Sequence, residues 1–157
     1  MKNKILIKKI NFSIARKKLI MQWLIFSGVI FVIYFVQTLT GRYEHYESDV
    51  WEWLFKYITP PLSLMIGVLI SQMSAQASDQ ESDIFYFRLA QGMSYFFLII
   101  LLLSAFLIPV IHLMQNRNLS AVEDQKSIMD ALKSYNAFLV PVQGLSTLTL
   151  GLFFTKK

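Results

Sequence analysis

Cysteine is absent from the 157 residues. Its absence excludes disulfides, thiol catalysis, iron–sulfur clusters and thiolate zinc sites. Histidine is scarce, with His45 and His112 as the two copies, and charged residues make up 16% of the chain. The sequence also lacks H-E-x-x-H, G-x-S-x-G and P-loop motifs. We therefore expect neither an enzyme nor a protein that binds a cofactor or a metal.

Apolar residues are abundant and come in blocks, and they account for 55% of the chain. Blocks of this kind are typical of membrane-spanning helices. We predict an all-α, polytopic membrane protein with four transmembrane helices in a bundle and short interfacial amphipathic helices. A basic tail, 1–18, precedes a membrane domain, 19–157, whose spans are expected at about 19–39, 56–75, 92–114 and 136–154.

The basic tail carries seven lysines and arginines and no acidic residue. Ile7, Ile10 and Ile14 fall at i, i+3 and i+7, a spacing that predicts an amphipathic helix lying on an anionic lipid leaflet. The net charge of +5 raises nucleic acid as another partner. No nucleic-acid motif is present, so we expect the lipid bilayer and not nucleic acid.

The first span, 19–39, contains 21 residues without a charge. At the helical rise it is about 31 Å long, enough to cross the hydrocarbon core. A cleaved signal peptide is the alternative interpretation. The apolar run is too long for that, and the segment after Gln37 lacks a small-residue cleavage site, so we predict a permanent anchor.

The second span contains small residues at every fourth position: Thr59, Ser63, Gly67, Ser71 and Ala75. This spacing is typical of membrane helices that approach another helix closely, and Ser63, Gly67 and Ser71 form its best contact face. Pro60 and Pro61 are expected at the entrance of the helix. The apolar core, 58–73, is short enough to be re-entrant, but we predict that it crosses.

Aromatic and acidic residues fill the segment before this span. Trp51, Trp53 and Tyr57 are predicted to anchor the chain at the lipid headgroups. His45 and Asp49 are four residues apart, which raises a metal site, although a solvated histidine is the simpler interpretation.

The third span follows a polar connection in which Ser78 and Glu81 have the spacing of a capping box. A helix is therefore predicted to begin near Asp79. Pro109 is expected to free the carbonyl of Ala105 and to kink the helix, with His112 just beyond.

A short amphipathic helix is predicted within 115–135, with Val122, Met129, Leu132 and Tyr135 on one face. The fourth span then combines a polar face, formed by Gln143, Ser146 and Thr147, with the packing glycines Gly144 and Gly151. Polar helices of this kind pack inside a bundle or line an aqueous path. We expect the second and fourth spans to form the main contact, with a close approach at Gly67.

Positive charge predicts the orientation of the four spans. Ten lysines and arginines fall in the tail, the 74–92 connection and the C-terminus, against five in the other two connections. The positive-inside rule then places both termini in the cytoplasm, in the plasma (cell inner) membrane.

The function expected from these features is assembly, as a homo-oligomer or with a protein partner. The chain is interpreted as an oligomeric pore-forming or membrane-perturbing subunit, including an effector of a toxin or defence system, or as the membrane anchor of a larger complex. A carrier subunit for a small solute or ion is the alternative. No charged residue lies inside a span and no internal repeat is evident, which disfavours a carrier.

Overall fold

The computed structural model describes residues 9–43, 45–73, 81–115 and 121–155. The described part of the chain contains five helices and one pair of three-residue strands. Four of the helices are long and apolar enough to cross a membrane. The predicted all-helical class with four long apolar helices is confirmed.

Helix α1, Phe12–Leu39, begins seven residues before the predicted span. The side-chain oxygen of Asn11 accepts from the backbone N–H of Ser13 at 3.0 Å and of Ile14 at 3.4 Å, which caps the helix there. The helix ends before Gly41, which has a φ of +71° and donates to the carbonyl of Thr38 at 2.9 Å. Glycine suits this left-handed position because it has no Cβ.

Two three-residue strands are present in the described part of the chain. Strand β1, Lys9–Asn11, directly precedes α1, and strand β2 is formed by Glu81–Asp83. They pair antiparallel, with Lys9 opposite Asp83 and Asn11 opposite Glu81. The prediction of helix throughout the tail is therefore wrong at 9–11, and the prediction of a helix start near Asp79 is wrong at 81–83. Residues 78–80 lie outside the described segments.

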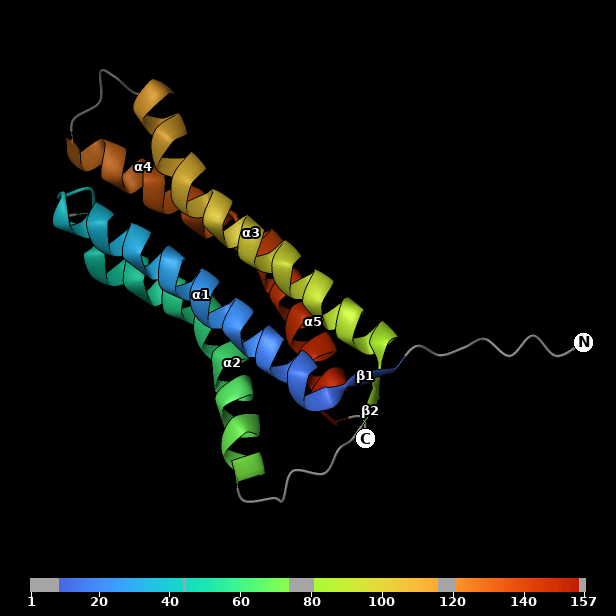
Figure 1. Ribbon diagram of the computed structural model, residues 1–157. Coiled ribbons are helices and arrows are strands. Elements are labelled where there is room, and N and C mark those ends of the chain that lie inside the picture. The colour runs from blue at the N-terminus through green and yellow to red at the C-terminus, as the bar shows by residue number, and fades with distance from the viewer. Residues whose placement is uncertain (1–8, 44, 74–80, 116–120, 156–157) are drawn as a thin grey trace, which may run out of the picture.

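Helix α2, Glu47–Met73, includes the aromatic segment that was predicted as an interfacial connection. Pro60 and Pro61 consequently lie inside the helix and not at its entrance. The helix persists upstream of them because Val50, Leu54 and Tyr57, at i, i+4 and i+7, are all buried in the bundle. Figure 1 shows α2 bent, with its second half diverging from the rest of the bundle.

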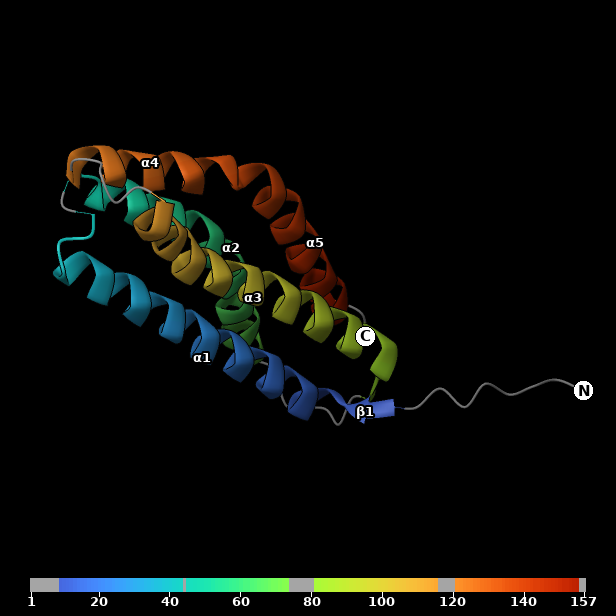
Figure 2. The ribbon, with the colours of Figure 1, turned by 90° about the horizontal axis from the view of Figure 1, so that it is seen from above.

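Helix α3, Ile84–Gln115, occupies the centre of the bundle. Figure 2 shows it between α1 and α5, Asn136–Thr155. Contact between α3 and α5 is the most extensive between any two elements, and α2 contacts α5 over a smaller surface. The prediction that the second and fourth spans form the main contact is therefore wrong. Small buried residues on α3, Ala90 and Ser94, leave room for its neighbours.

Helix α4, Ala121–Ser134, packs against α3 and α2 and leads into α5 through Tyr135. Met129 and Leu132 are buried, as the amphipathic pattern predicts, whereas Tyr135 is 41% exposed. The side chain of Val122 lies outside the described ones.

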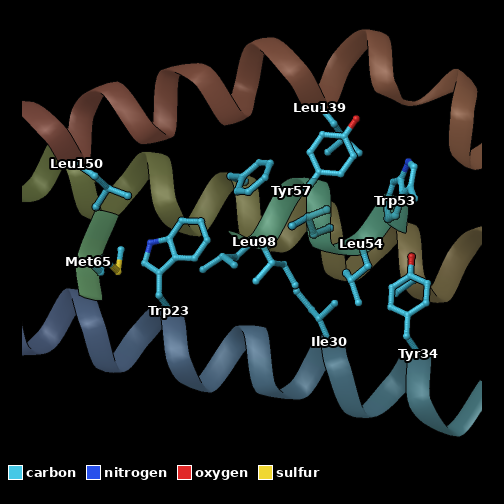
Figure 3. Packing of buried hydrophobic residues seen from close by; sticks show 14 of the residues in the cluster. Trp23, Ile30, Tyr34, Trp53, Leu54, Tyr57, Met65, Leu98, Leu139 and Leu150 are labelled. Carbon is cyan, nitrogen blue, oxygen red and sulfur yellow. The ribbon is translucent and has the colours of Figure 1, made fainter. Parts of the chain in front are cut away.

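Aromatic and aliphatic side chains from every long helix fill the core (Figure 3). Trp23 of α1 lies against Phe97 of α3, with ring centroids 5.9 Å apart. Tyr34 of α1 lies 6.3 Å from Trp53 of α2. The first contact joins α1 to α3, and the second joins α1 to the first half of α2.

Candidate functional site

A groove of about 770 Å³ opens between α2 and α5. It lies where the second half of α2 leaves the bundle. Pro60 and Leu64 of α2 line one wall. The other wall is α5, from Val140, Gln143, Gly144, Thr147, Leu148, Gly151, Leu152 and Thr155. No lining residue carries a charge, so the groove suits an apolar occupant.

The glycines of this region do not serve packing within the chain. A Cβ placed on Gly144, Gly151 or Gly67 would find no heavy atom within 4 Å outside its own helix turn. The close approach predicted at Gly67 is thus absent from the bundle, because α2 bends away after its prolines. These positions remain open to a helix from outside.

The predicted polar face is formed in part: Gln143 and Thr147 both line the groove, whereas Ser146 does not. Ser146 is fully buried, and its hydroxyl has no hydrogen-bond partner among the described residues. Gln143 bonds to α2. Of the predicted packing residues, Ser63 and Gly67 are exposed, and the side chain of Ser71 lies outside the described ones.

The Gln143 side chain has a role that sequence reasoning missed. Pro60 and Pro61 have no N–H, so the carbonyls of Lys56 and Tyr57 lose their helical donors. Gln143 Nε2 donates to both carbonyl oxygens, at 3.1 Å and 3.3 Å. One amide group thereby joins α5 to the bend in α2. Consecutive prolines in an apolar segment, together with a glutamine in another span, are the signal for it.

A second glutamine performs the same task at Pro109. The carbonyl of Ala105, which the sequence predicts to be freed, accepts from Gln37 Nε2 at 3.0 Å. The hydroxyl of Tyr43 donates to Gln37 Oε1 at 2.7 Å and so orients the amide. Burial raises the pKa of Tyr43 above its ordinary value, and Arg42 partly opposes this shift.

The predicted headgroup anchors divide into two groups. Trp51 is partly exposed and lies 5.0 Å from the ring of Phe31. Trp53 and Tyr57 are 4% and 0% exposed, so they face the bundle and not the lipid. The Trp53 indole N–H and the Tyr57 hydroxyl both donate to Asn136 Oδ1, which accounts for their inward orientation.

A smaller cleft of about 210 Å³ lies where α2, α4 and α5 meet. Its walls carry two acidic and two basic side chains, from Asp49, Glu52, Lys56 and Lys133. Trp53, Met129 and Asn136 complete its lining. Sequence reasoning did not group these residues, because more than 70 positions separate the two sides of the cleft.

His45 takes part in no metal site among the described residues. His45 is exposed, and the described residues contain no cluster of three or more histidines, cysteines or carboxylates that could hold a metal ion. The side chain of His112 lies outside the described ones.

Comparison with protein-family models, with curated proteins and with solved structures found no match.

Proposed function

We propose that this chain is a multi-pass membrane protein that acts by self-assembly, with a second copy docked in the α2–α5 groove. In this role it serves as a pore-forming or membrane-perturbing subunit, including an effector of a toxin or defence system, or as the membrane anchor of a larger complex. The glycine-lined groove, apolar and unfilled by the chain itself, is the observation that carries the proposal.

The outer surface of the bundle supports insertion into a bilayer. Large apolar side chains stand exposed along all four long helices, at 43–71% on α1 alone. Soluble monomers rarely expose contiguous apolar surface of this extent. A hydrocarbon solvent removes that cost, since these side chains then face lipid.

The ends of the helices support the proposed orientation. The ring of Phe12 at the start of α1 lies 5.2 Å from the ring of Phe153 near the end of α5. The start of α1 and the end of α5 therefore lie at the same end of the bundle. The tail that precedes Phe12 is strongly basic. By the positive-inside rule we assign this side to the cytoplasm of the plasma (cell inner) membrane, with the tail against anionic lipid.

A second copy is the occupant that fits the groove best. Thr147 with Gly144 and Gly151 forms a small-residue stripe over which another helix backbone can approach closely. The same stripe is present on every copy, so two α5 helices crossing there would form a two-fold interface in which each fills the other's groove. The groove also has no charged lining residue. An interface within the lipid bilayer favours such an uncharged surface, because a charge is costly there.

A carrier for a small solute or ion is less well supported. Carriers place charged groups in the bundle interior to bind substrate or coupling ions. Every buried polar side chain in the described part of the chain is uncharged: Gln22, Ser27, Ser94, Ser104, Ser146 and Thr149.

The test is the oligomeric mass of the purified protein, measured by native mass spectrometry in detergent. Gly144→Leu and Gly151→Leu place bulk in the groove, and we expect them to weaken association at least about tenfold, because each blocks close helix contact. Gly67→Leu tests the adjoining face of α2. A Cβ at any of these three positions meets no heavy atom within 4 Å outside its own helix turn.

Gly28→Leu is the matched control. Gly28 lies on α1, is exposed, and also has no atom within 4 Å of a Cβ, but it is not part of the groove. An unchanged mass for all groove variants, or an equal loss for Gly28→Leu, would contradict the proposal.

A further inference from the structure

The charged cleft between α2, α4 and α5 has a balanced set of charges. Asp49 and Lys133 form an ion pair with an Nζ–Oδ2 distance of 3.7 Å, a long separation for side chains that are about half exposed. Glu52 and Lys56 also line the cleft. Among the described residues neither forms an ion pair, and Lys56 Nζ lies 5.5 Å from the centre of the Tyr57 ring. A simple anion would meet the two carboxylates, and a simple cation would meet the two ammonium groups. The balance favours a zwitterion.

An oriented amide adds a donor to this set. Asn136 Oδ1 accepts from Trp53 Nε1 at 3.0 Å and from the Tyr57 hydroxyl. The indole N–H can only donate, so the side-chain oxygen of Asn136 is fixed on the Trp53 side. Within the described structure, the Asn136 Nδ2 group has no hydrogen-bond acceptor, and Asn136 lines the cleft. Its two N–H groups are therefore available to a ligand.

The position of the cleft relies on the membrane insertion proposed above. Helix α5 begins at Asn136 and has 20 residues, a length of about 30 Å that matches the hydrocarbon core. The start of α5 then lies at the level of the lipid headgroups, on the side away from the basic tail. The cleft opens at this depth.

We propose that the cleft binds the phosphoethanolamine headgroup of a zwitterionic phospholipid. Lys56, Lys133 and Asn136 Nδ2 donate to the phosphate oxygens, and Glu52 and Asp49 accept from the ammonium group. The volume of about 210 Å³ equals roughly seven water-sized groups, which fits a headgroup and not a whole lipid. A choline headgroup has no N–H to donate, so the carboxylates select ethanolamine.

The experiment titrates delipidated protein in detergent with phosphatidylethanolamine and with phosphatidylcholine of the same acyl chains, and counts bound lipids by native mass spectrometry. We expect one tight phosphatidylethanolamine per chain, bound about tenfold more strongly than phosphatidylcholine. The double variant Glu52→Gln with Lys56→Gln should lose this preference. Equal binding of the two lipids, or an unchanged preference in the double variant, would overturn the proposal.

A matched control lies on α4. Lys126 and Asp130 form the same pair of charge types at a spacing of four residues, both are exposed, and neither lines the cleft. Lys126→Gln with Asp130→Asn should retain the preference. A loss in this control equal to that of the cleft variant would mean that general surface charge determines binding, which would also overturn the proposal.

Two further measurements are needed. The first distinguishes a lipid ligand from a soluble one, and the second distinguishes failure of the cleft proposal from failure of the proposed membrane insertion. Free phosphoethanolamine that competes as well as the intact lipid would place the ligand in solution and overturn a lipid site. Carbonate extraction of membranes tests insertion on the same variants. A chain that resists extraction but shows no headgroup preference would refute the cleft proposal alone, whereas a chain released by carbonate would refute insertion itself.

Discussion

Two glutamine side chains replace the backbone hydrogen bonds that three prolines remove. Gln143 serves the carbonyls opened by Pro60 and Pro61, and Gln37 serves the one opened by Pro109. An unpaired carbonyl in hydrocarbon is costly, so these amides are part of the helix structure as well as bridges between helices. The sequence predicts which carbonyls are freed. It could not predict which side chain reaches them, because that depends on how the helices pack.

At the residue scale, Gln143→Leu is expected to destabilise the protein by about 1–3 kcal/mol, since it leaves the carbonyls of Lys56 and Tyr57 without their donor. Thermal unfolding in detergent, followed by circular dichroism, measures this loss.

The control for this prediction is a double-mutant cycle. Replacing both Pro60 and Pro61 by alanine restores the two backbone N–H groups, so Gln143→Leu should then cost much less. An equal loss with and without the prolines would show that Gln143 contributes by packing and not by supplying hydrogen bonds.

At the element scale, periodicity and length predicted the long helices well. Helix α5, Asn136–Thr155, coincides with the predicted span, and α1 ends at the predicted residue. The start of α2 was wrong because Pro60 resembles a helix entrance, whereas packing of the preceding aromatic residues keeps the helix intact. Strands β1 and β2 were not predicted, because three polar residues such as Glu81–Asp83 carry no periodic signal.

The junction of α4 and α5 depends on one polar side chain. Asn136→Ala removes the acceptor of the Tyr57 hydroxyl and one of the two acceptors of Trp53 Nε1; Leu132 O, at 3.0 Å, is the other. We expect faster amide hydrogen exchange across α4, because its attachment to α2 is weakened, with little change in the first half of α1. Hydrogen exchange with mass spectrometry measures both regions.

Asn136→Asp is the matched control for this substitution. It keeps an oxygen at the position that both donors reach, so exchange in α4 should stay near that of the unmodified protein. Equally fast exchange in both variants would show that the hydrogen bonds to Asn136 do not hold α4 in place.

At the scale of the whole molecule, α3 occupies the centre and α2 opens away from α5. Sequence reasoning placed the small residues of α2 and α5 against each other within one bundle. The structure leaves both sets open, since α3 takes the larger contact with α5 and the prolines bend α2. A sequence reveals which faces permit close approach, but it does not reveal whether the partner is the same chain or another copy.

Disulfide cross-linking in the native membrane tests the central claim, self-assembly through the groove, most directly. The chain has no cysteine, so each introduced cysteine reports on one position. If α5 helices of two copies cross at the groove, Thr147→Cys and Leu148→Cys give covalent dimers on mild oxidation. Val29→Cys, at a position 47% exposed on α1, stays monomeric. Dimers at Val29 as abundant as at the groove, or none at either groove position, would contradict the account.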